Sequence, residues 1–303
     1  MEIKRLRRRL GFHMLRLLAA RKAQQGVPAV ARTGEQIGRW HHKLARGQRR
    51  QLESQLSQLF ALPSSDPRPA QWLQESYRLN DRAIFEILAM YSGNLASAEV
   101  AERCDINDLA PLDRALEANN GVLLLGWHMG NGVAMATRLA HLGYPVSVVF
   151  RESKKIQPDF YPNGLNSMGL DAIGANPPAA GFRHMLKALK ANRIVYILMD
   201  QGIKHGLETP FLGKVVPMPP GPAELLRRTG CELVTARLIG VDPLWQFRLN
   251  RESALDADET VETSVEKLTK IMERQILEMP QWWTWHQRRW ARYPFPSVPQ
   301  DPS

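Results

Sequence analysis

The stretch Gly121–Val133, GVLLLGWHMGNGV, contains the clearest predicted strand of the chain and a histidine directly after it. The apolar run VLLL predicts a buried strand, and His128 follows it in a glycine-flanked turn. A catalytic imidazole is often presented in this way, and it needs an acid to fix its tautomer and stabilise its charged form. No Asp or Glu lies between Glu117 and Glu152. The sequence therefore leaves three hypotheses open: a relocated acid, a site that has lost its chemistry, or an ordinary turn.

The chain around this stretch alternates between apolar strands and helices. Strands are predicted at 122–125, 146–150, 194–200 and 232–240, and helices at 132–142, 181–191, 223–228 and about 257–278. A Gly/Pro-rich loop runs to Pro222. Because strands that are apolar throughout are buried on both faces, this pattern predicts an α/β fold with a mixed, largely buried sheet flanked by helices.

Two charged amphipathic helices are predicted before this region, over 35–60 and 70–94. We expect a basic amphipathic helix within residues 1–30 and one α/β domain over residues 31–303. The 303 residues are 44% hydrophobic, which is enough for a substantial core. The two cysteines, Cys104 and Cys231, show no metal-ligand spacing and no disulfide framework, so the sequence predicts no metal site and favours a reducing compartment.

The net charge of +10 comes from the N-terminal end, because residues 1–50 contain fourteen Lys or Arg against Glu2 and Glu35. The longest apolar stretch there, LGFHMLRLLAA, is too short to span a membrane and lacks a secretory cleavage site. Five apolar residues nevertheless share one helical face and are flanked by basic residues: Leu6, Leu10, Met14, Leu17 and Leu18. This pattern favours a helix at the interface of an anionic membrane. The alternatives are a helix packed on its own domain and, with the least support, a nucleic-acid contact, for which no binding motif is present.

Polar residues follow three of the predicted strands. The turn HMGN follows the first, Arg151 and Glu152 follow the second, and Asp200 and Gln201 follow the third. Ligands of open α/β sheets bind at the carboxyl ends of strands, so these residues are candidates for one common site. Each signal alone is weak, since a single histidine after a strand is more often structural.

Five segments in this order resemble the bacterial lipid A biosynthesis acyltransferase family, the late lauroyl and myristoyl transferases of the wider glycerolipid acyltransferase superfamily. They are GWHMGN, FRES, MDQG, PFLGK with PPGPAELLRRTG, and QWWTWHQRRW. The resemblance extends over nearly the whole chain. It implies transfer of a fatty acyl chain from acyl carrier protein or a coenzyme A thioester to a hydroxyl of an anionic lipid acceptor. No other cofactor is implied.

In this family the histidine of an H-x4-D/E motif removes the proton of the acceptor hydroxyl, which assigns that role to His128. The sequence departs from the family at the acid, because Val133 stands in its place and Gly132 replaces the usual Trp. We expect Asp200 to act as the substitute acid, with Glu152 as the second candidate. The resemblance implies substrate contacts at Gly130, Asn131, Arg151, Gln201, Arg288 and Arg289.

Other residues have competing interpretations. Lys204 and Lys214 are candidates for phosphate contacts, but they could also belong to a solvated crossover loop. Arg151 is a candidate for a contact with an oxyanion or a phosphate, and the alternative is an ion pair on the surface. The tryptophans of QWWTWHQRRW are typical of a core, while Arg288 and Arg289 beside them suit a lipid headgroup.

The favoured interpretation is a peripheral acyltransferase on the cytoplasmic face of the inner membrane of a Gram-negative bacterium. The main alternative is a catalytically inactive relative that binds an acyl lipid or acyl carrier protein. A thioester hydrolase has no specific support, and the nucleophile elbow G-x-S-x-G is absent from the sequence.

Overall fold

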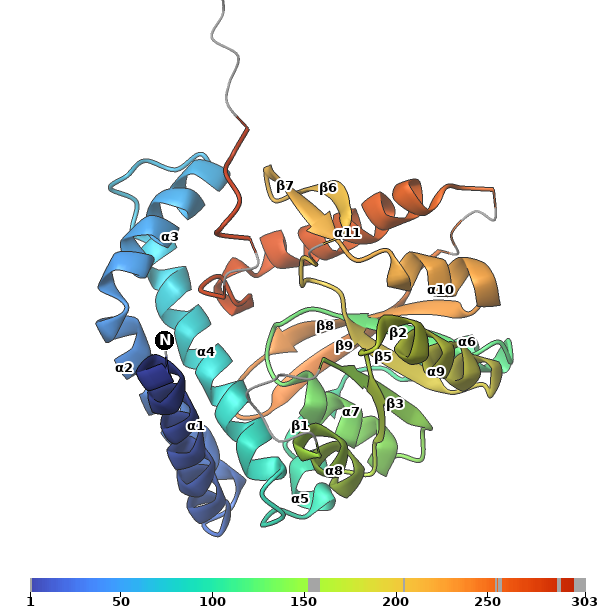
Figure 1. Ribbon diagram of the computed structural model, residues 1–303, viewed down its shortest axis with the longest axis horizontal. Helices are drawn as coiled ribbons and strands as arrows, with labels where there is room; N and C mark the ends of the chain where they lie inside the picture. Colours follow the sequence, from blue (N-terminus) through green and yellow to red (C-terminus); the bar gives the residue numbers. More distant parts are fainter. Residues whose placement is uncertain are drawn as a thin grey trace, which may run out of the picture.

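A computed structural model of the chain describes residues 2–151, 159–203, 205–253, 255, 258–287 and 290–296, and it contains an α/β core with a helical N-terminal region (Figure 1). Its seven-stranded sheet has the order β1-β9-β8-β2-β5-β3-β4. The strands are β1 (Cys104–Ile106), β2 (Val122–Gly126), β3 (Val146–Phe150), β4 (Asp171–Gly174), β5 (Ile194–Leu198), β8 (Glu232–Gly240) and β9 (Trp245–Arg251). All neighbours are parallel except β8 and β9, which pair antiparallel. The mixed, buried sheet that the sequence predicts is confirmed.

The centre of the sheet explains why the VLLL run is so strongly apolar. All five residues of β2 are buried, and β2 pairs with β5 on one side and β8 on the other. Helix α7 (Gly132–His141) covers one face of the sheet, whereas α9 (Pro178–Lys190) and α10 (Gly221–Thr229) cover the opposite face. A strand with helices on both sides needs apolar side chains in both directions, which is why β2 does not alternate.

The N-terminal region consists of α1 (Glu2–Ala23), α2 (Val27–Leu44), α3 (Arg46–Leu59) and α4 (Arg68–Met90), which lie together at one side of the sheet (Figure 1). The prediction of one helix over 35–60 is wrong, because the chain leaves helical geometry at Ala45, between α2 and α3. Helices α2 and α4 pack closely at Gly38, where a Cβ would lie 2.5 Å from the backbone oxygen of Tyr77.

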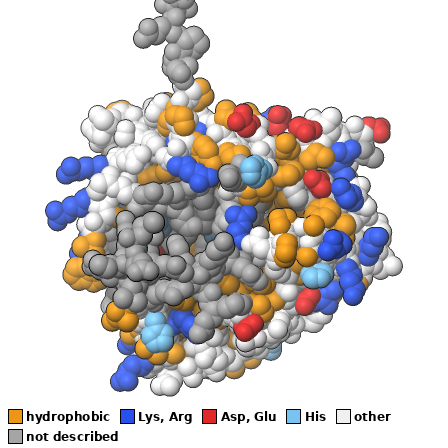
Figure 2. Space-filling view, in the orientation of Figure 1, with side chains coloured by type: hydrophobic (Ala, Val, Ile, Leu, Met, Phe, Trp, Pro, Cys, Tyr) orange, Lys and Arg blue, Asp and Glu red, His pale blue; other side chains and the backbone are white. Residues whose placement is uncertain are grey.

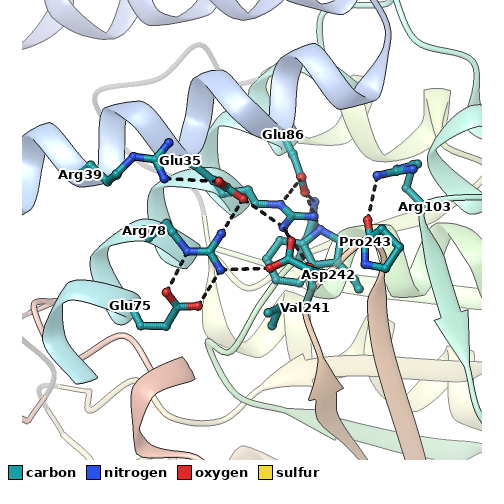
Figure 3. Close-up of polar contacts among 12 residues, drawn as sticks. Glu35, Arg39, Glu75, Arg78, Glu86, Arg103, Val241, Asp242 and Pro243 are labelled. Carbon is teal, nitrogen blue, oxygen red and sulfur yellow. Dashed lines mark hydrogen bonds and ion pairs between the residues drawn. The ribbon is translucent and has the colours of Figure 1, made fainter. Parts of the chain in front are cut away.

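An ion-pair network around the buried Arg82 joins α2 and α4 to the turn between β8 and β9 (Figure 3). Arg82 of α4 is 2% exposed and lies 2.9 Å from Glu86, 3.0 Å from Asp242 and 3.4 Å from Glu35. Arg78 also pairs with Glu35, at 2.6 Å. Because Arg82 is buried, removing its acidic partners would leave its charge without compensation, so these ion pairs stabilise the packing of α2 and α4 against the β8–β9 turn.

The remaining elements include several that the sequence did not indicate. The loop predicted to run to Pro222 contains a hairpin of β6 (Leu207–Phe211) and β7 (Lys214–Met218), whose turn has Leu212 at a φ of 49°. Because a leucine with a positive φ is not one of the usual hairpin signals, the sequence did not predict this hairpin. Strands β1, β4 and β9 were also missed, as were α5 (Ser97–Ala101), α6 (Ala110–Glu117) and α8 (Phe160–Ser167). The chain ends its regular structure with α11 (Val261–Glu278) and the 3₁₀ turn η1 (Pro280–Trp282).

Lys214, offered from the sequence as a phosphate contact, is instead enclosed by aromatic side chains. It is 1% exposed, and its Nζ lies 3.5 Å from the ring centre of Trp290 and 4.5 Å from that of Phe295. No hydrogen-bond acceptor for Nζ lies among the described residues. The phosphate interpretation of Lys214 is therefore wrong, because its ammonium group points into a desolvated cage that a phosphate does not reach.

This burial gives a pH dependence of stability that Lys214→Met should remove. Burial lowers the pKa of Lys214 from 10.5 to about 8. Between these values the unfolded chain binds more protons than the folded one, so the wild-type free energy of unfolding should rise with pH by about 3 kcal/mol more than that of the variant. Denaturant melts from pH 7 to pH 10.5 measure this difference. Parallel curves for the two proteins would contradict it.

Candidate active site

His128 and Asp200 meet at the carboxyl edge of the sheet because their strands are paired in register. Gly126 of β2 is the partner of Leu198 of β5, and each candidate residue lies two positions further along its own strand. The Nδ1 atom of His128 is 2.6 Å from Oδ1 of Asp200. The backbone N–H of His128 donates to Oδ2 of the same carboxylate at 2.9 Å. Adjacent parallel strands thus bring together an imidazole and an acid that are 72 residues apart.

The carboxylate of Asp200 is fixed by a third donor that the sequence did not identify as part of the site. Trp283 donates its indole N–H to Oδ2 at 2.8 Å, and the Asp200 residue is 1% exposed. Thr284, the next residue, donates its hydroxyl to the backbone oxygen of His128 at 2.8 Å. Because an ionised carboxylate only accepts hydrogen bonds, Nδ1 of His128 carries the proton and Nε2 is left with its lone pair.

The Nε2 atom of His128 faces the side chain of Gln201. The amide Nε2 of Gln201 lies 3.2 Å from it, at a distance that suits donation from the amide to the ring nitrogen. Gln201 follows Asp200 directly, so the same strand end supplies a group to each nitrogen of the imidazole. The arrangement defines one tautomer of His128, with its basic nitrogen directed away from the buried acid.

His128 borders a cavity of about 350 Å³ whose other walls are mostly apolar. The polar lining comes from His128, Gln201, Asn80, Thr284 and Gln287, and Arg151 is also part of the wall. The apolar lining comes from α1, α4, β3 and α8 and includes Phe12, Ile84, Ile87, Leu88, Val148, Phe150, Phe160 and Leu165. An apolar cavity with a few polar groups at one place is the usual form of a site for a small or chain-like ligand.

Comparison with known families identifies the family of this sequence. The profile of the family described as bacterial lipid A biosynthesis acyltransferase matches residues 5–292, nearly the whole chain. The chain belongs to this family. No match was found among the curated proteins.

The chain differs from the family pattern at two positions, with Gly132 in place of the usual Trp and Val133 in place of the acid. Tyr196 explains the first difference. A Cβ on Gly132 would lie 2.1 Å from the hydroxyl oxygen of Tyr196, so the phenol fills the space that a side chain at position 132 would need. Burial, followed by the nearby Asp200 carboxylate, raises the pKa of Tyr196, which therefore remains a neutral phenol. Val133 lines the cavity itself. Position 133, where the family has its acid, is therefore part of the apolar wall of the cavity.

The resemblance to the family predicts a substrate contact at Asn131, but Asn131 is not among the residues that line the cavity. It is 1% exposed; its side-chain oxygen caps α7 by accepting from Ala134 N at 3.0 Å. Its amide donates to Glu86 at 2.9 Å, and Glu86 also accepts from Trp245 at 2.7 Å. Asn131 therefore holds the turn after His128 in place, and Glu86 extends the ion-pair network of α4 to this turn. Gly130, in contrast, borders the cavity.

The other predicted site residues divide between the cavity wall and the part of the chain that is not described. Arg151 and Gln201 line the cavity. Arg288, Arg289, Glu152 and Lys204 lie outside the described residues.

Three tryptophans of the C-terminal segment belong to the core. Trp283, Trp285 and Trp290 are fully buried and pack edge to face in sequence, with ring centres 4.6 Å and 5.2 Å apart. The role of Trp283 at Asp200 was missed because a tryptophan that packs in a core gives no separate sequence signal for the acceptor of its N–H.

Proposed function

We propose that the chain transfers a fatty acyl group from a thioester donor to a hydroxyl of a lipid A precursor or related lipid, with His128 as the general base. The family supports acyl transfer in lipid A biosynthesis. The observation that carries the assignment of the base is the 2.6 Å contact between His128 and the buried Asp200, at the edge of an apolar cavity. The acid missing after His128 is thus replaced by one from the neighbouring strand.

The geometry supports a direct transfer without an acyl-enzyme. The acceptor hydroxyl takes the place of the Gln201 amide at Nε2 of His128, and its oxygen attacks the thioester carbon while its proton passes to Nε2. Asp200 stabilises the resulting imidazolium through Nδ1. The tetrahedral intermediate then collapses as its C–S bond breaks, and the proton on Nε2 goes to the departing thiolate. The ester and the free thiol are the products, and His128 returns to its starting state.

The cavity walls suggest where the reacting groups lie. Apolar side chains from α4, β3 and α8 suit the hydrocarbon of the acyl chain. The displaced Gln201 amide and the Arg151 guanidinium are donors that could face the oxygen of the intermediate as its charge develops. Acyl carrier protein and acyl coenzyme A both carry such a thioester, and the basic N-terminal end suits either anionic donor.

Helix α1 suits attachment to an anionic membrane at the cytoplasmic face of the inner membrane. Leu10, Met14 and Leu17 are 57%, 61% and 58% exposed, whereas Phe12 on the same helix lines the cavity. Lys and Arg side chains and apolar ones occur together along the edge formed by the N-terminal helices (Figure 2). Among the described residues, no helix is long and apolar enough to cross a bilayer. The helix would therefore lie in the interface beside the cavity wall.

Introducing charge on this face should weaken membrane binding without unfolding the protein. The double variant Met14→Asp/Leu17→Asp should bind vesicles with anionic lipid at least about 100-fold more weakly, because burying each such side chain contributes about 1.5–3 kcal/mol. Vesicle co-sedimentation measures this binding. The matched control is Leu142→Asp/Leu277→Asp, at sites that are 41% and 39% exposed. Equal binding by both double variants and the wild type would exclude α1 as the attachment site.

Val133 favours a second candidate, a catalytically inactive relative that binds an acyl lipid or acyl carrier protein. The two candidates differ in what Val133→Glu should do. If Asp200 is the functional acid, a second carboxylate beside the cavity is unnecessary and is desolvated, so the variant should show lower transfer than the wild type. If the chain is inactive for lack of the motif acid, the variant should gain activity.

The deciding experiment is an acyl-transfer assay with labelled acyl carrier protein or acyl coenzyme A as donor and a bacterial lipid extract as acceptor. We expect turnover by the wild type and reduced turnover by Val133→Glu. Turnover by Val133→Glu alone would establish the inactive relative instead. The labelled product identifies the acceptor.

A further inference from the structure

Three potential metal ligands from distant parts of the chain meet beside the active site, although the sequence shows no metal-ligand spacing. They are His41 of α2, Asp81 of α4 and His286, which follows η1. One ligand atom from each residue lies within 4.8 Å of the others. Only the packing of α2 on α4, with the C-terminal segment beside them, brings these three residues together.

The hydrogen bonds within the cluster hold its ligand atoms in place. His41 Nδ1 is 2.8 Å from Oδ2 of Asp81. Asn80 donates from one amide to Oδ1 of Asp81 at 2.8 Å, and the same amide lies 3.1 Å from Nε2 of His286. Donation from Asn80 requires that Nε2 carry a lone pair, so Nε2 of His286 is an acceptor beside the amide that also binds the Asp81 carboxylate. The His286 ring is also stacked on Tyr77, with centres 4.0 Å apart.

We propose that His41, Asp81 and His286 form a binding site for a divalent transition-metal ion, with Zn²⁺ as the best-suited ion. Two imidazoles and one carboxylate suit Zn²⁺ and its neighbours in the first transition row, whereas Mg²⁺ and Ca²⁺ prefer oxygen ligands. The ion takes the place of the hydrogen between His41 and Asp81 and of the Asn80 amide hydrogen at His286. Water completes the coordination on the side of His41, which is exposed.

Modest side-chain movement is sufficient to form this site. Ligand atoms about 2.0–2.1 Å from a tetrahedral ion are about 3.3 Å apart, compared with the 4.8 Å limit observed in the cluster. Rotation of the side chains closes the remaining distance, and the exposed His41 side chain rotates most easily. Arg49 is close enough for its positive charge to act on the pKa values of Tyr77 and His42, in the direction of lower values. It is paired with Glu53 at 3.3 Å, which offsets part of this charge.

A bound ion would hold in place the C-terminal segment that contacts His128 and Asp200. His286 is two residues from Thr284 and three from Trp283, which bind the His128 backbone and Asp200 respectively. Asn80, which borders the cavity, would also lose its contact with His286. A bound ion therefore links α2 and α4 to the C-terminal side of the active site.

The test is a titration of the tag-free, chelator-stripped full-length chain with Zn²⁺ by calorimetry and with Co²⁺ by its visible absorption. We expect one equivalent to bind, and Zn²⁺ at about 100 times its Kd to raise the Tm by about 5 °C. This measurement uses no acyl substrate, so it stands apart from the test of the proposed function.

Three variants and one control decide the assignment. His41→Ala, Asp81→Asn and His286→Ala should each weaken binding by roughly tenfold or more, which at the same Zn²⁺ concentration would reduce the Tm rise by about half or more. His184→Ala, on an exposed position of α9, should bind like the wild type. If His286→Ala does not fold, the exposed His41 and the near-isosteric Asp81→Asn still decide the result. Absence of binding by the wild type would overturn the proposal, as would binding that is unchanged in His41→Ala and Asp81→Asn.

Discussion

Replacing His128 by Ala is expected to lower kcat for acyl transfer by about 10²–10⁴, with a smaller change in KM. The reason is that Nε2 of His128 is the nitrogen that carries a lone pair at the cavity, because Nδ1 is committed to Asp200. Without the imidazole, the acceptor hydroxyl would have to attack with its proton still bound. Steady-state kinetics with labelled thioester donor and lipid acceptor measure the loss.

The control for this variant is His184→Ala, which removes an exposed imidazole from α9 and should leave kcat unchanged. Thermal melts of both variants show whether the fold is retained, since His128 also contributes its backbone to the contacts with Asp200 and Thr284. These backbone contacts persist in His128→Ala, so a large loss of stability is not expected. Unchanged turnover in a folded His128→Ala protein would remove the proposed mechanism.

The sequence was sufficient to predict the central strands and the edge of the sheet at which His128 and Asp200 lie. Apolar runs without alternation identified the buried strands, and the polar residues after them identified the carboxyl edge. The structure brings His128 and Asp200 together because Gly126 and Leu198 are register partners, and a sequence pattern does not contain a register. Asp200 could therefore be proposed as the acid from the motif, but its distance from His128 could not be predicted.

The features that sequence reasoning missed depend on contacts between distant segments. Trp283 and Thr284 reach the active site from a segment more than 80 residues after Asp200, and Glu86 reaches Asn131 from α4. Lys214 was misinterpreted for a similar reason, because its aromatic cage is formed by residues at the C-terminal end of the chain. Local periodicity carries no information on such contacts.

The proposed use of Asp200 as the acid also changes the surroundings of His128. Tyr196 occupies the space beside Gly132, and Val133 adds an apolar side chain to the cavity. An acid at position 133 would face the cavity, whereas Asp200 is buried and accepts hydrogen bonds from the His128 backbone and the Trp283 indole. The substitution therefore removes a negative charge from the cavity wall while the imidazole keeps a carboxylate partner, which favours an acceptor or acyl chain that is apolar at this point.

Asp200→Asn is expected to lower kcat by about 10²–10⁴ even though the side chain keeps its shape. Among the described residues, the backbone N–H of His128 and the indole N–H of Trp283 donate to Oδ2, and Nδ1 of His128 faces Oδ1. The asparagine oxygen should therefore take the place of Oδ2, which turns the amide N–H towards Nδ1 of His128. The proton of His128 then moves to Nε2, and the imidazole can no longer act as a base at the cavity.

Trp283→Phe is the comparison that separates this effect from a general loss of packing. It removes one donor to Oδ2 but leaves the carboxylate on Nδ1, so kcat should fall far less than in Asp200→Asn, although the buried oxygen loses a hydrogen bond of about 1–3 kcal/mol in stability. The measurements are kcat, KM and Tm for both variants, together with the ring-nitrogen NMR shifts of His128, which report which nitrogen carries the proton. A large loss of kcat in Trp283→Phe with no change of tautomer in Asp200→Asn would mean that Asp200 acts through packing alone. Nε2 protonation in Asp200→Asn, with a nearly normal Trp283→Phe, would instead establish Asp200 as the acid that orients the base.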